Sequence, residues 1–318
     1  MMSSQIETSI VIATYNRASY LAQCLEALAR LEFDPKRFEV LIVDNNSNDD
    51  TPTVCMHFIQ AHPELDIRYI FEKNQGASQA RNRGVEEARG EIICFLDDDS
   101  PPFPHWLHTL LQALNDPSVG CAGGPSILDF QGQAIPRWLD GDLQSLLSSY
   151  ALPYTEITQL TEWYQFPLSC NMAIRRRLFY ELGFLRTDLS KIADQPLAAA
   201  ETEMADRINK AGWKVVYVPH APVYHLVPPE RLNREYIYHR GRGLAKSHII
   251  LTDSRKPHII LRWFASDGWY AARRFFWLSL AIIERNEKWF DDYIRFWIIA
   301  QRIPLRFKRL FSGGRSLA

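Results

Sequence analysis

The chain has 318 residues, of which 47% are hydrophobic, enough to fill one large core or two modest ones. Its 36 Lys and Arg residues balance 37 Asp and Glu residues, so no global charge recruits nucleic acid or an anionic membrane. The 5 cysteines form no CxxC pair and have no histidine at metal-site spacing, which predicts reduced and mostly buried thiols.

The N-terminus and the longest apolar run indicate where in the cell the protein is expected to lie. The N-terminus lacks a basic lead and a cleavage site, so we expect no signal peptide. The longest apolar candidate, residues 275–283, is about half the roughly 20 residues that a spanning helix needs. We therefore expect a cytoplasmic enzyme, with at most a peripheral position at the inner face of the plasma membrane.

Short β-branched runs alternate with helical stretches over residues 9–95, which predicts an α/β fold with a Rossmann-like nucleotide-binding sheet and helices on both faces. Helices are expected over residues 19–30, from Thr51-Pro52 onward and over 77–88. The predicted strands are 9–13, 39–43, 67–71 and 91–95.

A polar cluster follows each of these strands, and such sheets bind ligands beyond the carboxyl ends of their strands. Four clusters at one sheet edge predict a site. In chain order they are Thr14-Tyr15-Asn16-Arg17, Asp44-Asn45-Asn46-Ser47, Lys73-Asn74-Gln75-Gly76 and Asp97-Asp98-Asp99.

The pattern loosens after residue 100. Residues 126–165 are expected to form long irregular loops with a short helix near 142–149, a length of loop that is uncommon unless functional. Regular structure is expected again over 168–177, in a helix from Glu201 to Ala211, and in strands within 213–217 and 222–225.

The acidic triplet closes an apolar strand, so its carboxylates leave the core at the predicted site. The first and third, Asp97 and Asp99, can converge on one hard divalent cation, for which Mg²⁺ or Mn²⁺ with substrate phosphates is the expected occupant. A solvated acidic turn is the alternative.

Two further groups suit a nucleotide. Gly76 opens a helix whose free N–H groups can bind phosphate, and the forked guanidinium of Arg81 can add charge-assisted hydrogen bonds. The alternatives are that Gly76 is only a turn residue and that Arg81 is an ordinary surface residue. Asp44 can accept from the imide N–H of a base such as uracil or guanine; a helix-capping role is its alternative.

Five segments resemble, in their order, the inverting glycosyltransferases of family 2, which have the GT-A fold; the resemblance covers about residues 8–230. Length and loop style are also similar to those of cyanobacterial exopolysaccharide glycosyltransferases. The segments are SIVIATYNR, VLIVDNNSNDDT, KNQGASQARNRGVEEARGEIICFLDDD, LSCNMAIRR and ETEMADRINKAGWKVVYVPHAPVYH.

The resemblance implies a site. Asp97 to Asp99 would be the DxD motif for metal and ribose, and His225 would complete the metal shell, although a lone histidine is more often structural. The family's acidic base motif is altered here to Ala200-Glu201-Thr202-Glu203, which leaves Glu201 and Glu203 as the candidates. The nucleotide would be held by Thr14, Tyr15, Asp44, Asn74 and Arg81.

We expect Glu201 to be the base. In a helix, residues two apart point nearly opposite ways, and Glu201 shares its side with Met204, Ala205, Ile208 and Ala211. Glu203 is expected to face solvent and to pair with Arg207.

The resemblance also implies a reaction: metal-dependent, inverting transfer of a sugar from a nucleotide diphosphate to an acceptor hydroxyl, in polysaccharide or glycoconjugate biosynthesis. The expected donor is a UDP-sugar, ahead of a GDP- or dTDP-sugar. The expected acceptor is a saccharide or a lipid-linked molecule. A nucleotidyltransferase is the alternative enzyme, but the glycine-rich, lysine-containing signature expected near its first strand is missing. The second alternative is a non-catalytic protein that binds a nucleotide-sugar.

The domains expected are a catalytic domain over 1–230, with a nucleotide-sugar-binding half (1–125) and an acceptor-binding half (126–230), and a helical extension over 231–318. The extension interleaves aromatic and basic residues, which predicts either a peripheral membrane contact or a subdomain packed on the catalytic domain. Its aromatic and basic residues include Trp263, Trp269, Trp277, Trp289, Trp297, Arg273, Arg274, Arg295, Arg302, Arg306, Lys308 and Arg309.

Overall fold

The computed structural model describes residues 6–139, 141–189, 199–252, 257–283 and 289–311. The chain divides into two compact units. The first contains the described residues up to 131, with 148–189 and 200–227, and the second contains 132–147 apart from residue 140, residue 199 and the described residues from 228 onward.

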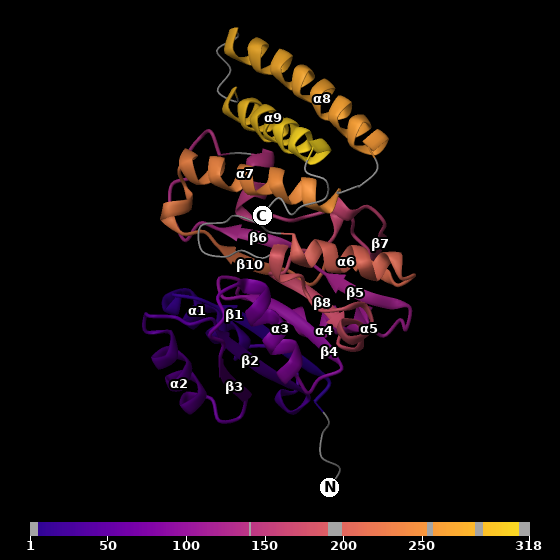
Figure 1. Ribbon diagram of the computed structural model, residues 1–318. Coiled ribbons are helices and arrows are strands. Elements are labelled where there is room, and N and C mark those ends of the chain that lie inside the picture. The colour runs from indigo at the N-terminus through magenta and orange to yellow at the C-terminus, as the bar shows by residue number, and fades with distance from the viewer. Residues whose placement is uncertain (1–5, 140, 190–198, 253–256, 284–288, 312–318) are drawn as a thin grey trace. The chain divides into compact units, whose positions relative to one another are not determined.

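A mixed sheet lies at the centre of the first unit (Figure 1). Among the described residues it has 8 strands, in the order β3-β2-β1-β4-β8-β5-β9-β7. The strands β3, β2, β1 and β4 are mutually parallel, which confirms the predicted βαβ arrangement of this half of the sheet. Their bounds are β1 Thr8–Thr14, β2 Phe38–Asp44, β3 Asp66–Phe71 and β4 Ile92–Asp97.

The other half of the sheet begins with a reversal of direction. β8 is antiparallel to both β4 and β5, β9 is parallel to β5, and β7 is antiparallel to β9. A separate two-stranded sheet pairs β10 with β6. The bounds are β5 Val119–Gly123, β6 Ser126–Asp129, β7 Thr158–Leu160, β8 Asn171–Arg175, β9 Lys214–Tyr217 and β10 Val223–Leu226.

Helices cover both faces of the sheet, as the alternation of side chains along a strand requires. Ile10 and Ile12 of β1 lie in one core with the buried sides of α1, α2 and α4. Val11, on the opposite face, contacts α3, and Phe95 contacts Phe179 of α5 edge to face. The bounds are α1 Ala18–Leu28, α2 Thr51–Ala61, α3 Ala77–Glu87, α4 Trp106–Ala113, α5 Arg177–Leu182 and α6 Ala200–Lys210.

The prediction of irregular structure over 126–165 was partly wrong, because β6 and β7 lie there. Both strands are short, and β7 pairs at the sheet edge with β9, so its formation depends on a partner more than 50 residues away along the chain. The predicted short helix is present as a 3₁₀ helix over Gly141–Leu147. The prediction for the cysteines is confirmed, since all five are buried and free.

The second unit is helical. Its bounds are α7 Arg234–Leu251, α8 Pro257–Ile283 and α9 Trp289–Phe311. α8 and α9 lie side by side, and α9 also packs against α7 (Figure 1). Among the residues that the structure describes, no helix is both long enough and apolar enough to cross a bilayer.

Candidate functional site

The predicted polar clusters meet at the carboxyl edge of the parallel strands. The register pairs Thr14 with Asp44 across β1 and β2, and Ala13 with Asp97 across β1 and β4. Because all three strands run in the same direction, the residues that follow them leave the sheet side by side. This is the edge at which the sequence predicted a site.

The three aspartates are held differently. Asp97 is partly exposed, whereas Asp98 and Asp99 are almost fully buried. The hydroxyl of Thr14 donates to Asp98 Oδ2 at 2.8 Å. Burial raises the pKa of the Asp98 carboxyl to about 7, against the opposing effect of the nearby Arg17. The site therefore concentrates acidic groups where water stabilises them poorly.

Arg17 offsets part of this charge, a role that the sequence analysis did not assign. Its guanidinium lies 2.8 Å from Asp99 Oδ2 and 3.3 Å from Asp98 Oδ1, and it stacks 4.7 Å above the ring of Tyr20. Its place in the cluster after β1 was visible in the sequence. Its partners were not, because they follow β4, about 80 residues further along.

A group of three side chains could hold a metal ion. Among the described residues, atoms of Asp97, Asp99 and His225 come within 4.8 Å of one another. His225 Nε2 lies 3.6 Å from Asp99 Oδ1, and the backbone N–H of Leu226 donates to the Asp99 carbonyl at 2.8 Å. Strand β10 thus brings the histidine to the aspartates. Two carboxylates and an imidazole fit Mg²⁺ or Mn²⁺, with substrate oxygens completing the shell.

Arg81 joins this group to the candidate base. Nη2 donates to Asp97 Oδ1 at 2.6 Å, and Nη1 donates to Glu201 Oε1 at 2.5 Å. Nη2 also donates to the hydroxyl of Ser169. Burial disfavours the charge, but Glu201 and Asp97 outweigh it and raise the pKa of Arg81 above its usual value. The guanidinium that the sequence assigned to the donor is thus occupied by protein carboxylates.

The two candidate bases lie on different sides of α6. Glu201 joins Arg81 at the site, whereas Glu203 Oε2 accepts from Arg207 Nε at 3.0 Å. Arg207 also donates to backbone carbonyls at the end of α5, including Leu182. The predicted Glu203–Arg207 pair is present, but Glu203 is less open to solvent than expected, with a side chain 17% exposed.

The helical phase inferred for α6 is mostly correct. Met204, Ala205 and Ile208 are buried, as predicted for the side shared with Glu201. Ala211 is exposed, which corrects the prediction. The helix ends at Lys210, so its periodicity no longer determines where the side chain of Ala211 points.

The loops after β2 and β3 are tied together beside the predicted nucleotide groups. The Asn45 side chain donates to the carbonyls of Glu72 and Asn74 and accepts from the N–H of Gly76. Gly76, at φ 145°, precedes α3 in a conformation that favours glycine. This network fixes the entrance to the helix that carries Arg81.

The remaining predicted nucleotide residues differ in exposure. Tyr15 is 42% exposed and Asn74 is also exposed, so both present side chains to solvent. Asp44 is buried, and its carboxylate accepts from Tyr69 Oη at 2.6 Å and from the backbone N–H of Ser47 at 2.9 Å. Tyr69 and Ser47 had not been singled out individually.

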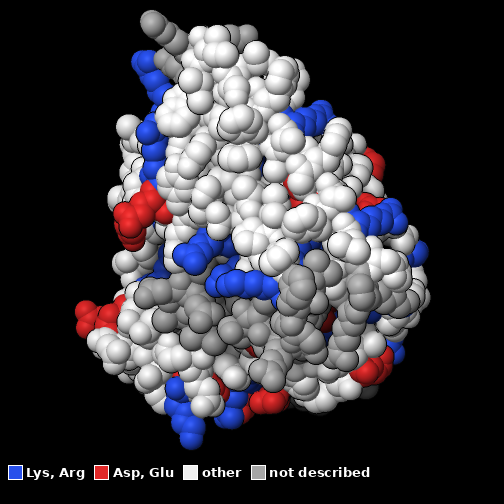
Figure 2. Space-filling view, turned by 45° about the horizontal axis from the view of Figure 1, so that its top comes forward, with Lys and Arg blue, Asp and Glu red and all other residues white. Residues whose placement is uncertain are grey.

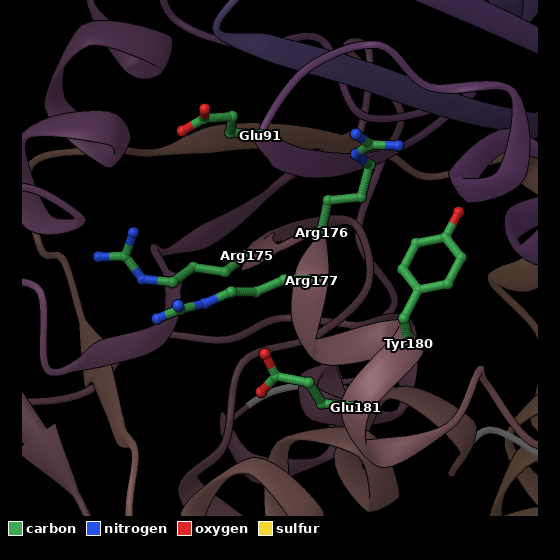
Figure 3. A pocket seen from close by; sticks show the side chains of 6 residues that line it. All are labelled: Glu91, Arg175, Arg176, Arg177, Tyr180 and Glu181. Atoms are coloured by element: carbon green, nitrogen blue, oxygen red, sulfur yellow. The ribbon is translucent and has the colours of Figure 1, made fainter.

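A polar pocket lies at the opposite end of these strands (Figure 3). Glu91 precedes β4, and Arg175 ends the antiparallel β8. Arg175 and Arg177 extend in the same direction in Figure 3, whereas Arg176 extends away from them. Arg175 donates to the carbonyls of Val119 and Leu114, and Arg177 stacks 4.7 Å from the Trp213 ring. These contacts give both side chains structural roles.

Comparison with known proteins places this arrangement in a family. The model of glycosyl transferase family 2 matches residues 9–183, which contain β1 except Thr8, all of β2 and β4, and the acidic triplet. The chain belongs to glycosyl transferase family 2. The family match stops before α6 and β10, so Glu201 and His225 lie outside the matched segment.

Individual family 2 relatives match different lengths of the chain. The glycosyltransferase AglE of Haloferax volcanii is 35% identical over 124 residues, which are 39% of this chain and 40% of that protein. This chain therefore covers less than half the length of the first curated relatives. A glucosyl-dolichyl phosphate glucuronosyltransferase of the same organism is 23% identical, over 74% of each chain.

A solved structure shares the fold over most of the chain. The mannosyltransferase from Pyrobaculum calidifontis, in complex with GDP-Man and Mn²⁺, superposes with a TM-score of 0.61 at 19% identity. The match covers 97% of this chain and 88% of that one. The predicted GT-A fold is therefore confirmed.

Proposed function

We propose that this protein is a metal-dependent, inverting glycosyltransferase that moves a sugar from a nucleotide diphosphate to an acceptor hydroxyl. The observation that carries the proposal is the chain of contacts from the metal-type group through Arg81 to Glu201. It links groups suited to binding a diphosphate with a carboxylate suited to accepting a proton. Sugar transfer by displacement needs both.

The residues at the acidic edge suit a divalent cation. Asp97, Asp99 and His225 would hold Mg²⁺ or Mn²⁺, which when bound offsets the charge that develops on the departing diphosphate. The hydrogen bond from the Thr14 hydroxyl holds the Asp98 carboxylate in place. Asp98 is proposed to lie beside the ribose of the donor, as the family resemblance implies. The complex of the Pyrobaculum mannosyltransferase with GDP-Man and Mn²⁺ supports this assignment by analogy of fold.

Glu201 is the proposed general base. Its carboxylate takes the proton from the acceptor hydroxyl while the acceptor oxygen forms a bond to the anomeric carbon. The bond from that carbon to the diphosphate oxygen breaks, and the nucleoside diphosphate leaves with its electron pair. Because a single displacement reverses the configuration at the carbon, the product is expected to be inverted.

The donor is proposed to lie along the carboxyl ends of β1, β2, β3 and β4. Tyr15 and Asn74 present exposed side chains there, and Asp44 occupies the strand end next to them. A UDP-sugar remains the leading candidate donor. The acceptor is a saccharide or is lipid-linked; the relative that acts on glucosyl-dolichyl phosphate supports the second choice.

The domain boundaries at 125 and 230 remain part of the proposal, with residues 126–230 shaping the acceptor side. We also propose that the helical extension, 231–318, makes a peripheral membrane contact. A surface-bound enzyme would meet a lipid-linked acceptor in two dimensions.

The proposal is tested with the full-length protein and a panel of UDP-, GDP- and dTDP-sugars. A donor that binds raises the temperature of unfolding by mass action, and Mn²⁺ should increase that shift. Release of nucleoside diphosphate separates a catalyst from a binding protein. The anomeric configuration of the product, determined by NMR, tests inversion.

Asp99→Asn should abolish the effect of Mn²⁺ on donor binding, because it removes one of the three proposed ligands. Glu26→Gln, an exposed carboxylate on α1, is the matched control and should behave as the wild type. Equal donor affinity in EDTA and in Mn²⁺ for the wild type would exclude the metal site. Binding without nucleoside diphosphate release, with any acceptor, would exclude catalysis.

A further inference from the structure

One side of α8 carries large apolar side chains that are exposed. Leu261, Trp269, Phe276 and Ile283 are between 55% and 76% exposed. Their spacing places them within about 80° of one another around the helix, at roughly 100° per residue. Leu278, on the opposite side, is buried, and α8 packs against α9. These four residues define the α8 face.

Within the described residues of α8, the exposed charged side chains beside the α8 face are arginines. Arg262 and Arg273 are exposed at its border, and the guanidinium of Arg273 lies 5.7 Å from the Trp269 ring. Asp267 is the acidic residue of α8 within 258–283, and it is buried and bonded to Arg306 Nε of α9. In the described part of α8, no carboxylate therefore accompanies the exposed arginines.

Two exposed aromatic side chains with a polar edge lie further around α8, beyond Arg273 as counted from the α8 face. Tyr270 and Trp277 are each 49% exposed, and such rings favour the boundary between lipid and water. In Figure 2, much of the upper half of the visible face is white, with blue and a few red side chains at its margins. Exposed aromatic and aliphatic residues bordered by arginine are typical of helices that lie in a membrane interface.

We propose that the α8 face docks on the surface of a bilayer that contains anionic lipids. The helix is about 40 Å long at 1.5 Å per residue, and it would lie parallel to the membrane with its apolar side among the acyl chains. Arg262 and Arg273 would then meet lipid phosphates. This inference deepens the proposed membrane contact but does not depend on sugar transfer.

A symmetric contact between two copies fits this face less well. An isologous interface brings the same patch of both copies together, so the arginines of one copy would approach those of the other. The described part of α8 offers no outward carboxylate to pair with them. An anionic lipid surface supplies the missing negative charge.

Flotation of the full-length protein with vesicles tests the proposal. Binding to phosphatidylcholine vesicles that contain phosphatidylglycerol should exceed binding to pure phosphatidylcholine by about tenfold or more, because each basic residue near anionic lipid contributes roughly fivefold. Arg262→Gln with Arg273→Gln should remove most of that preference. Arg30→Gln with Arg83→Gln, two arginines of the first unit, is the matched control.

The apolar part of the face is tested separately. Trp269→Ser with Phe276→Ser should weaken binding to both kinds of vesicle by about tenfold or more, whereas Met56→Ser with Tyr180→Ser, exposed residues of the first unit, should not. In Trp269→Phe, which keeps an aromatic ring, tryptophan quenching by brominated lipid should fall while binding is kept.

Three outcomes would overturn the proposal: no vesicle binding by the wild type, equal binding by the Trp269→Ser, Phe276→Ser variant, or a change of oligomeric state in that variant with vesicle binding unaltered. The last would make the α8 face an interface between copies. Nucleoside diphosphate release with a water-soluble acceptor is measured alongside, so loss of the membrane role and loss of the proposed catalysis are distinguished.

Discussion

Arg81 Nη1 lies 2.5 Å from Glu201 Oε1, although 120 residues separate them in the chain. The same guanidinium holds Asp97. One arginine therefore fixes the distance between a proposed metal-binding carboxylate and the proposed base. Side chains that are positioned by such bonds react with little further rearrangement.

The first prediction concerns the base. Glu201→Gln keeps the size of the side chain but cannot accept the acceptor proton, so the transfer rate should fall by about two orders of magnitude or more. Glu203→Gln is the matched variant on the same helix and should retain most activity, because Glu203 pairs with Arg207 instead. Single-turnover rates, with donor affinity measured separately, check this. Loss of turnover in Glu203→Gln alone would reassign the base.

The second prediction separates positioning by Arg81 from donor binding. Lysine cannot hold two carboxylates with one planar fork, so Arg81→Lys should lower kcat by about tenfold or more. The KM for the donor should change little, since the guanidinium is occupied by Asp97 and Glu201. Arg83→Lys, two residues along on α3, is the control. A large rise in donor KM with kcat unchanged would show that Arg81 binds the phosphates, as the sequence alone suggested.

A third prediction concerns Arg17 and metal affinity. Its guanidinium lies 2.8 Å from Asp99 Oδ2, so it competes with a cation for the same carboxylate. Arg17→Gln should therefore bind Mn²⁺ about tenfold more tightly when no nucleotide is present, because one repulsive charge near the site is removed. Isothermal titration calorimetry measures this directly. Weaker Mn²⁺ binding in the variant would mean that Arg17 instead holds the aspartates in their binding geometry.

The fourth prediction is a dependence of stability on pH in the helical unit. Burial lowers the pKa of His248 to about 3, with Arg302 and Arg306 adding to the effect. An unfolded histidine titrates near 6.5, so between these values the unfolded chain binds more protons and stability falls as pH falls. At pH 5 this amounts to about 2 kcal/mol relative to pH 8.

His248→Gln should remove that loss, leaving a flatter profile of unfolding free energy between pH 5 and pH 8. His258→Gln, an exposed histidine at the start of α8, should keep the profile of the wild type. Chemical unfolding followed by far-UV circular dichroism, which reports on helix content, provides the measurement. Identical profiles for the wild type and His248→Gln would show that another group carries the acid sensitivity.

Much of the first half of the fold could be predicted from local pattern. β1, β2, β3 and β4 were placed to within a residue or two, because each is a short apolar run between polar turns. β6 and β7 could not be predicted in the same way. They have 4 and 3 residues, and strands so short gain their stability from a partner distant in the sequence.

The sequence by itself determined where the polar groups of the site lie along the chain. Parallel strands of a βαβ sheet end at one edge, so Thr14, Asp44 and Asp97 had to come together once the strands were recognised. The helical period of α6 likewise separated Glu201 from Glu203.

Only the tertiary structure decided which charges pair between segments that are distant in the chain. Arg17 with Asp99, Arg81 with Glu201, and His225 beside Asp99 join segments that are between 82 and 126 residues apart. An ion pair requires its atoms to approach within a few ångströms, and that distance depends on how whole elements pack. For groups so far apart, residue type and spacing along the chain carry no such information. The partners of Arg17, Arg81 and His225 therefore appeared only when β4, α6 and β10 were assembled around the sheet edge.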